Sequence, residues 1–573
     1  MQSRTLVMLL TVVLLITAPV ATLLARGAAE EVEPESEFID GRYEPPITLT
    51  TPMSVHDPDE WPEGDSFEYN AFTRWVESEL GIQFEPSWRF PDHETNVERL
   101  GLAAAAGDMP DFVYAPDEDI ARLARDGTLI PLNDIVEEYA SPLTQHFIDI
   151  GQEAVDGTLF YPTTVDGEFY GMPHSPENVW DVNWIRTDLL DELGLDIPRT
   201  LDDLEEALAA YKDAYEKPGF ALAEDLTAAD MVFHAHGGYP GLWVENDDGE
   251  LEYGSIQPEV RDALARLNTW YEEGWIDQEF VVHGWDQAIL EPAAAGDLFV
   301  THGPWWFIWW PWVGLWEENP DAQIVAFSPL ENLDGEVMAM LDSPFYGWST
   351  GVSVNAEYPE ALMHLLNEKI DSYHRNNEEL RDLMADRGYE FKYPVTERQE
   401  PLNPEAEEPF LYQYEYEHPG WGFFNDGTTH FNRAMGFFLY SEPDPWFGPD
   451  GQHFEIYDAH HADAIDELPA ELRDEYRNLR DIERRLDSHF HTVETIRDLR
   501  DRDAIEYNRY LGAPTPAMAE NEAYLSRIEE EAFVQIIMGE EPIEHFDEFV
   551  EQWLAGGGID VTEEVNEWYR GVE

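Results

Sequence analysis

The chain has 573 residues, of which 43% are hydrophobic, enough for two or three compact domains and too much for a disordered acidic tail. Its 121 acidic against 32 basic residues give a net charge of −89, which excludes nucleic acid as a partner and disfavours anionic membrane surfaces. It has no Cys, which excludes disulfides and thiolate chemistry.

The acidic residues are spread along the chain and mixed with apolar ones, so we expect them to coat folded surfaces. Only four basic residues are Lys, namely Lys212, Lys217, Lys369 and Lys392. Many hydrated carboxylates and few ammonium side chains suit solubility in concentrated salt, where screening removes self-repulsion. This composition predicts a halophilic protein.

Residues 1–29 are predicted to be a signal sequence or a membrane anchor, because residues 6–25 form an uncharged run long enough for either. A lipobox-like segment ends at Arg26, which stands where the lipidated Cys would be. Cleavage after Ala29 fits a small-x-small rule, and residues 30–45 then read as an acidic tether. We expect an exported protein, periplasmic or at the cell surface, either free or held by an uncleaved N-terminal helix.

Beyond residue 45 the pattern is mixed α/β. Strands are predicted over 46–55, 82–88 and 112–114, and helices over 70–80 and 95–106. This alternation indicates a doubly wound sheet.

Farther along, Gly turns that feed short strands are predicted at 126–132 and 166–173. A helix beginning at Leu201 is predicted to be capped by Thr200, with Asp203 as its partner in a capping box. Residues 246–249 are predicted to form a hairpin turn.

A calcium loop at 246–249 is disfavoured, because the spacing is wrong and the closing Glu is missing. Residues 370–510 are predicted to be mainly helices and loops.

Motifs for catalysis are lacking: there is no phosphate loop, nucleophile elbow or zinc-protease helix. The close His pairs, His234 with His236 and His460 with His461, have no obvious third ligand nearby, so neither a metal site nor a cofactor is expected. With 121 carboxylates, chance spacing supplies many acidic pairs, and no glycosidase dyad can be singled out. We therefore expect no catalytic residues and a protein that is not an enzyme.

A tryptophan-rich run follows Gly303-Pro304, and five of the 20 Trp residues fall between Trp305 and Trp312. An indole face matches the apolar face of a sugar ring, so the run favours a carbohydrate platform. A buried aromatic corner or a partner interface would use the same residues.

Several segments, in the right order, resemble those of family 1 extracellular solute-binding proteins, the substrate-binding proteins of carbohydrate ABC transporters. The resemblance extends over most of residues 46–570 and includes A-x-G-D-x-P-D, D-G-x-x-Y-G-x-P and Y-x-E-G-x-I-D patterns. The segments are 103–113, 126–134, 166–173, 184–200, 271–277, 512–518 and 533–569, the last two resembling the long lipoprotein-type subgroup. Glu168 stands where the family usually has Lys.

The resemblance implies the type II periplasmic-binding-protein fold, with two α/β lobes, a hinge and an interlobe ligand cleft. Lobe one would comprise residues 46–173 and 325–400. Lobe two would comprise residues 174–324 and a helical C-terminal part, 401–573. It also implies a monomeric receptor that hands an oligosaccharide to membrane permease subunits.

Residues 294–305 are similar to a stretch of the maltose-binding type of receptor, in which the Trp of Gly-Pro-Trp stacks on sugar. Trp305 is therefore the first candidate for ligand binding. Trp306 and Trp309 are weaker candidates, and the later Trp residues of the run are expected to pack.

Further candidates follow from the same comparison, because they lie on loops expected to face the cleft. They are His56, Asp57, Glu60 and Trp61 after the first strand, Tyr114, Asp117 and Asp119 near residue 114, Trp180, Asp181 and Trp184 past the first crossing, and Trp348 at a later crossing. Packing, or the ordinary acidic surface of a halophile, would account for many of them equally well.

Two other functions stay open at this point. An acidic extracellular glycoside hydrolase would need two carboxylates facing each other across a cleft, about 5–10 Å apart. A receptor of the same fold could instead take a peptide or another solute, since a fold does not determine its ligand.

Overall fold

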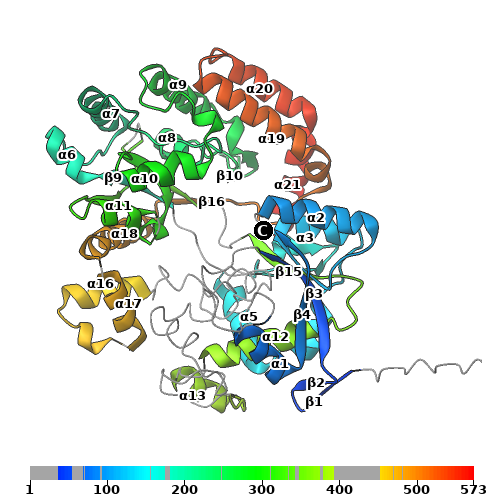
Figure 1. Ribbon diagram of the computed structural model, residues 1–573. Coiled ribbons are helices and arrows are strands. Elements are labelled where there is room, and N and C mark those ends of the chain that lie inside the picture. The colour runs from blue at the N-terminus through cyan, green and yellow to red at the C-terminus, as the bar shows by residue number, and fades with distance from the viewer. Residues whose placement is uncertain are drawn as a thin grey trace, which may run out of the picture.

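The structure is a computed structural model that describes most of the chain from residue 36 onward. The described residues are 36–54, 69, 71–90, 93–154, 157–173, 181–246, 248–309, 311–332, 335–341, 347–374, 378–392, 452–468, 470–480 and 482–572. They form two α/β lobes, one built around β3, β4, β5 and β15 and the other around β9, β12 and β13 (Figure 1). The expected two-lobed α/β fold is confirmed.

Lobe one holds two small sheets. In the first, β3 (Ile47–Ser54) pairs in parallel with β4 (Ile82–Phe90). In the second, β15 (Trp348–Val352) lies antiparallel between β5 (Phe112–Pro116) and β8 (Gly171–Pro173). The backbone N–H of Thr50 donates to Asp111 Oδ2 at 2.7 Å, which ties β3 to the start of β5.

Helices cover these sheets, and the predicted first five elements are all present within a few residues of their expected bounds. The helices of lobe one are α1 (Ala71–Leu80), α2 (His93–Ala106), α3 (Asp117–Arg125), α4 (Asn133–Tyr139), α5 (Pro142–Ala154), α12 (Ala361–Tyr373) and α13 (Glu378–Asp386). The short pairs β1 (Glu37–Ile39) with β2 (Arg42–Glu44), and β6 (Thr164–Val165) with β7 (Glu168–Phe169), lie at the edges.

Lobe two has a three-stranded antiparallel sheet. Its central strand is β9 (Asp181–Arg186), flanked by β12 (Val300–Pro304) and β13 (Ile324–Phe327). Its helices up to residue 318 are α6 (Thr187–Leu193), α7 (Leu201–Tyr215), α8 (Asp230–His236), α9 (Pro258–Glu272), α10 (Glu291–Ala295) and α11 (Trp312–Glu318). The pairing of β13 corrects the expected domain boundary, because residues 324–327 belong to lobe two and the chain returns to lobe one beyond them.

Two local predictions in lobe two are confirmed. Thr200 Oγ1 accepts from the backbone N–H of Asp203, and the Asp203 carboxylate accepts from the N–H of Thr200, which completes the capping box of α7. β10 (Trp243–Glu245) and β11 (Leu251–Tyr253) form a hairpin. Its turn is held by Asn246 Oδ1, which accepts from the backbone N–H of Asp248 and Glu250.

The C-terminal helices pack on lobe two in two groups. α16 (Gln452–His461), α17 (Ala470–Arg480) and α18 (Glu483–Asp501) bury their apolar faces against β9, β13 and the tryptophan-rich run. α19 (Pro516–Ile537), α20 (His545–Trp553) and α21 (Ile559–Val572) pack with α8, α9 and the β10–β11 hairpin. β14 (Ala339–Leu341) and β16 (Ile505–Tyr507) form a small parallel pair between the two groups.

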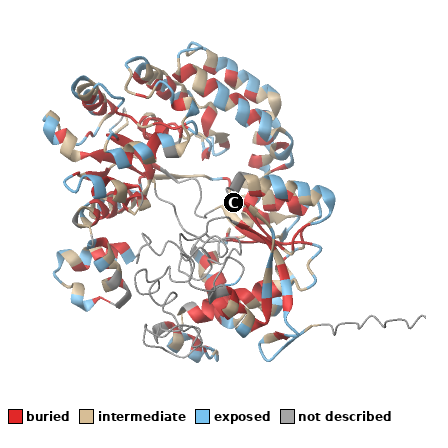
Figure 2. Ribbon diagram, in the orientation of Figure 1, coloured by how far each residue is buried: buried red, intermediate tan, exposed pale blue. Residues whose placement is uncertain are grey.

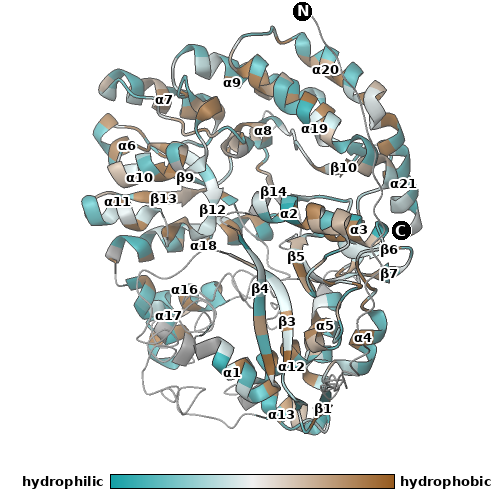
Figure 3. Cartoon of the chain, turned by 45° about the vertical axis from the view of Figure 1, so that its right-hand side comes forward, coloured by the Kyte–Doolittle hydropathy of each residue, from teal (hydrophilic) through white to brown (hydrophobic). Residues whose placement is uncertain are grey.

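Each lobe is built around its own core. Buried residues follow the strands and the inward faces of the helices, while the outward helix faces are exposed (Figure 2) and hydrophilic (Figure 3). No helix in the described part of the chain is both long and apolar enough to cross a membrane.

Candidate ligand-binding site

The chain passes between the lobes at matching edges of their sheets. In lobe one, Trp348 at the start of β15 is in register with Pro116 at the end of β5, beside the end of β8. In lobe two, Asp181 at the start of β9 is in register with Pro304 at the end of β12. Because β8 leads directly toward β9 in the chain, these two edges belong to the side of each lobe that faces the other.

The two lobes touch through α3 and the residues near it in lobe one, and through the C-terminal segment in lobe two. The guanidinium of Arg125 on α3 donates to the carbonyl of Pro514. The ring of Tyr161 meets the ring of Trp568 edge-on, with centroids 6.2 Å apart. Burial and, to a smaller extent, the nearby carboxylate of Asp119 raise the pKa of Glu522 on α19.

Two aromatic residues that are predicted to bind ligand lie together at the lobe-one edge. The rings of Tyr114 on β5 and Trp348 on β15 have centroids 4.8 Å apart and planes inclined by 32°. Tyr114 is buried, and the indole of Trp348 is half-buried above it. Trp348 therefore keeps part of its surface open while Tyr114 supports its ring.

Asp117 opens α3 directly beside this pair. Its backbone N–H donates to the carbonyl of Gly347 at 3.0 Å, which links the helix start to the residue before Trp348. The residue is 9% exposed, and its Oδ1 atom is buried with no hydrogen-bond partner among the described residues. Burial raises the pKa of Asp117 to about 6, a shift that the Ser349 hydroxyl opposes only in part.

Asp119, two residues later in the same helix, has a different environment. Its carboxylate accepts from Arg122 Nε at 3.1 Å and forms an ion pair with that guanidinium. Asp117, in contrast to Asp119, therefore has no ion pair with a described residue.

Asp181 occupies the equivalent place on the lobe-two edge. The residue is half-buried, but its Oδ1 atom is fully buried and has no hydrogen-bond partner among the described residues. Burial raises the pKa of Asp181 to about 7. A buried carboxylate oxygen without a donor is costly, so this atom is suited to accept from a ligand.

Trp184 is a core residue rather than a ligand contact, which corrects its selection as a candidate. Its side chain is fully buried, and its indole N–H donates to the carbonyl of Gly303 at 3.1 Å. Its ring stacks near Phe307, with centroids 6.2 Å apart, and meets Trp312 edge-on at 5.7 Å. The neighbouring candidate Trp180 lies outside the described residues.

The Trp run divides into covered and partly open rings. Trp305 is only 7% exposed and meets His453 of α16 edge-on, with centroids 5.1 Å apart. Trp306 is half-buried against Trp285, and half-buried Trp309 lies under the guanidinium of Arg485, which is 4.4 Å from the ring centroid.

Trp312 and Trp316 are buried in the same cluster. The Trp run therefore mainly packs against α16 and α18. Little of the Trp305 side chain is accessible to a ligand.

The candidates after the first strand, His56, Asp57, Glu60 and Trp61, lie outside the described residues.

A pocket in lobe two adds residues that the sequence pattern does not single out. Its volume is about 610 Å³. Its walls come from the chain after residue 223, from α8, from the hairpin and from α19. The lining residues are Glu224, Asp225, Leu226, Asp230, Phe233, Pro240, Gly241, Tyr253, Ser526, Glu529, Glu530 and Phe533.

This pocket is joined to the sheet of lobe two through the chain segment that precedes it. The segment before it runs parallel to β12, with the N–H of Ala221 donating to the carbonyl of Val300 at 3.0 Å. Within the pocket, Glu529 Oε1 accepts from Ser255 Oγ at 2.7 Å, while Oε2 is buried without a hydrogen-bond partner in the described structure. Burial raises the pKa of Glu529 to about 7.

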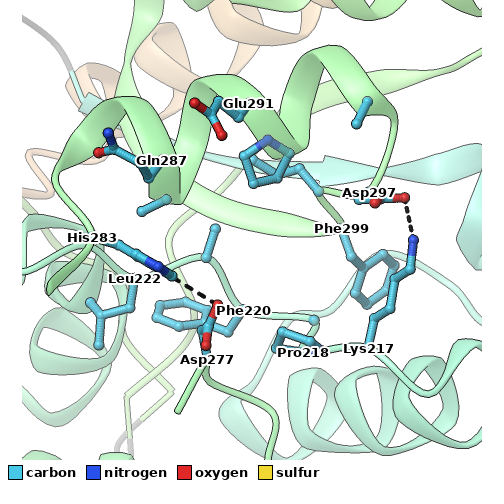
Figure 4. Close-up of a pocket in the computed structure, with 16 residues that line it drawn as sticks. Lys217, Pro218, Phe220, Leu222, Asp277, His283, Gln287, Glu291, Asp297 and Phe299 are labelled. Carbon is cyan, nitrogen blue, oxygen red and sulfur yellow. Dashed lines mark hydrogen bonds and ion pairs between the residues drawn. The ribbon is translucent and has the colours of Figure 1, made fainter. Parts of the chain in front are cut away.

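A second cavity, of about 360 Å³, lies beside the residues that precede β12 (Figure 4). Phe220, Leu222 and Phe299 line it together with an ion pair between Lys217 and Asp297. Since Asp297 and Phe299 precede β12, this cavity extends toward the opposite end of the strand from Trp305. We therefore place the candidate site at the other end.

Buried His residues behind the lobe-two edge are structural. His302 Nδ1 lies 2.8 Å from Asn183 Oδ1, and the ring of His302 meets that of His234 edge-on at 5.8 Å. Burial lowers the pKa of His302 to about 4 and, with the charge of His302, that of His234 to about 3. Among the described residues, no three His, Asp or Glu side chains are arranged to hold a metal ion.

Two known proteins are similar to this chain in sequence over part of its length. The "Fructooligosaccharide ABC transporter substrate-binding protein FusA" of Streptococcus pneumoniae is 24% identical over 310 residues, covering 48% of this chain and 54% of that protein. The "Polygalacturonan/rhamnogalacturonan-binding protein YtcQ" of Bacillus subtilis is 25% identical over 222 residues, covering 36% and 41%. The matches thus span about half the length of these relatives, or less.

Solved structures share the fold over nearly the whole chain. The alginate-binding protein AlgQ2 without calcium ion superposes with a TM-score of 0.61 at 17% identity, covering 92% of this chain and 98% of that one. FusA of S. pneumoniae in complex with kestose superposes with a TM-score of 0.56 at 16% identity, covering 92% and 99%. These likenesses confirm the periplasmic-binding-protein fold. The family model for bacterial extracellular solute-binding proteins matches residues 59–367, more than half of the chain, so this protein belongs to that family.

Proposed function

We propose that this protein is the extracytoplasmic receptor of an ABC importer, and that it binds an oligosaccharide between its two lobes. One observation carries the proposal: half-buried Trp348, backed by Tyr114, lies beside the Oδ1 atom of Asp117, to which no described residue donates a hydrogen bond. An aromatic face next to a buried acceptor is what a sugar ring requires, since the ring has an apolar face and a hydroxyl rim.

The relatives support the carbohydrate part of this proposal. FusA and YtcQ are named for a fructooligosaccharide and for polygalacturonan or rhamnogalacturonan, respectively. Asp181 and Glu529 supply further buried acceptor atoms on the opposite lobe. Closure of the lobes around the sugar would remove water from these atoms and would be the signal that the permease subunits read.

Isothermal titration tests the proposal with uncharged and acidic oligosaccharides in a buffer of high KCl concentration. Saturable binding to at least one of them is expected, with the sugar recovered unchanged after long incubation. Shortened products would instead favour the hydrolase, and saturable binding of peptides alone would favour a receptor for another solute.

We also propose that the receptor is a monomer exported through residues 1–29. Arg26 in place of the lipidated Cys favours a protein held by an uncleaved helix or released after Ala29, rather than a lipoprotein. The intact mass of the exported protein distinguishes these forms, and light scattering on the purified protein measures its oligomeric state.

A further inference from the structure

The charge class of the sugar is a question that the relatives leave open, because they include binders of both uncharged and acidic glycans. An acidic glycan carries a carboxylate on each uronate ring. A site for it must supply cations, usually Arg or Lys, to offset the loss of hydration. The charged groups around the candidate site therefore indicate which class it can take.

On the lobe-one side the site has an uncompensated carboxylate. Asp117 forms no ion pair within the described structure, and no cation contributes to its pKa shift. The nearby basic residues of α3 are used elsewhere, since Arg122 pairs with Asp119 and Arg125 donates to the carbonyl of Pro514.

On the lobe-two side, Asp181 is in the same situation. Asp181 has a buried Oδ1 and its pKa shift arises from burial alone. The pocket beyond it is lined by five carboxylates and, among the described residues, by no Lys, Arg or His. Those carboxylates belong to Glu224, Asp225, Asp230, Glu529 and Glu530.

These groups are acceptors that fit hydroxyls and repel anions. A carboxylate oxygen accepts a short, charge-assisted bond from a sugar hydroxyl, and an aspartate can accept from two neighbouring hydroxyls at once. A uronate placed against the same oxygens would bring like charges together in a partly dehydrated site, where repulsion is strongest.

We propose that the receptor takes an uncharged oligosaccharide, and that Asp117, Asp181 and Glu529 exclude uronates from the site. The inference rests on the proposed function and adds the charge class of the ligand to it.

Calorimetric titration tests this on the full chain in KCl and a chelator, at mildly alkaline pH. The uncharged probes are kestose and manno-, xylo- and malto-oligosaccharides, and the charged probes are galacturonate and alginate oligomers of matched length. The wild type is expected to bind the best uncharged probe at least about 100-fold more tightly than any uronate.

Isosteric variants then test which of the three carboxylates exclude uronates. Each of the variants Asp117→Asn, Asp181→Asn and Glu529→Gln is expected to lower the affinity for the uncharged probe. Each should also reduce the ratio of that affinity to the affinity for the uronate. Asp134→Asn, at an exposed position on α4, serves as the matched control and should keep the wild-type ratio. Because the ratio compares two ligands on one variant, a general loss of folding does not change it.

The outcomes separate the two proposals. A uronate that binds as tightly as the uncharged probes overturns the charge inference and leaves the sugar receptor intact. A ratio that stays the same in all three variants overturns the roles of these carboxylates. Failure of every glycan in both classes overturns the receptor proposal together with the inference.

Discussion

Tyr114 and Trp348 lie ring to ring, with centroids 4.8 Å apart, although they belong to distant parts of the sequence. The contact exists because β15 pairs with β5, so Thr350 opposes Tyr114 and Trp348 opposes Pro116. The chain leaves lobe one and returns before it makes this contact. Any motion of β15 against β5 therefore moves the indole relative to Asp117, which couples the proposed binding surface to the segments that join the lobes.

Replacing Trp348 by Ala should weaken glycan binding by about 2 kcal/mol, or about 30-fold in Kd, because it removes the half-buried indole that packs on Tyr114. Calorimetry with the best-bound uncharged probe measures the loss. Trp275→Ala is the matched control, since Trp275 is another half-buried Trp that packs on the lobe-two core. Equal affinity of Trp348→Ala and wild type would contradict the role of this ring.

Replacing Gly303 by Ala should destabilise lobe two by about 1–3 kcal/mol. A Cβ at Gly303 would stand 2.6 Å from the Phe307 ring, which must then shift together with the Trp305 turn. Gly314→Ala in α11 is the control, because its Cβ would meet Ala294 at an ordinary 3.5 Å. Chemical denaturation of both variants measures the difference, and equal stability would contradict the tight packing of Phe307.

Local pattern was sufficient for the first strands and helices, for the capping box at Thr200 and for the hairpin turn at Asn246. It also selected Tyr114, Asp117 and Trp348, which the fold brings to one edge. These features depend on residues close in sequence or on a short family motif.

Burial depends on partners that are distant in sequence, and there the sequence was less informative. Trp305 is covered by His453, and Trp184 is enclosed by Phe307 and Trp312. An indole has the same local signature whether its face meets water or another helix. The pocket carboxylate Glu529 likewise lies on a helix whose sequence resembles any other acidic surface helix, and only its packing against Ser255 distinguishes it.

His489 should make the fold sensitive to acid. Its ring is fully buried against His453, with centroids 4.4 Å apart, and burial lowers the pKa of His489 to about 3. An unfolded His titrates near pH 6.5, so below about pH 6.5 the unfolded state binds a proton that the folded state does not. The free energy of unfolding should therefore fall by about 1.4 kcal/mol per pH unit on this account, until the pH approaches 3.

Other groups act in the opposite direction, so the comparison must be between variants. Burial raises the pKa of Glu475 to about 7, and that carboxyl stabilises the fold as the pH falls below 7. His489→Leu should have a shallower loss of stability with acid than wild type, measured by urea denaturation at several pH values. His491→Leu, whose side chain is 41% exposed on the same helix, should keep the wild-type slope. Identical slopes for all three proteins would contradict the assignment.

Glycan affinity should depend on pH through Asp117 and Asp181, whose pKa values are raised to about 6 and about 7. Both are ionised at alkaline pH and become protonated as the pH falls through these values, which removes acceptor strength. Affinity for an uncharged probe should thus decline between about pH 8 and about pH 5, by at most about tenfold per pH unit for each group. The same protonation should improve uronate binding. The pKa of Glu529, which burial raises to about 7, lies in the same range, so the triple variant Asp117→Asn/Asp181→Asn/Glu529→Gln should show neither trend.

Salt should stabilise the protein strongly, because its net charge is −89. Raising KCl from about 0.1 M to about 1 M shortens the screening length from about 10 Å to about 3 Å and so weakens repulsion between carboxylates. Tm measured by calorimetry is expected to rise throughout this range.

Glu522, which faces Asp119 of the other lobe, is one specific source of repulsion. Glu522→Gln should raise Tm most at low salt, whereas Glu520→Gln, exposed on the same helix, should raise it less. A Tm that is independent of KCl would contradict the halophilic interpretation, because unscreened repulsion between surface carboxylates would then contribute little to the stability of the fold.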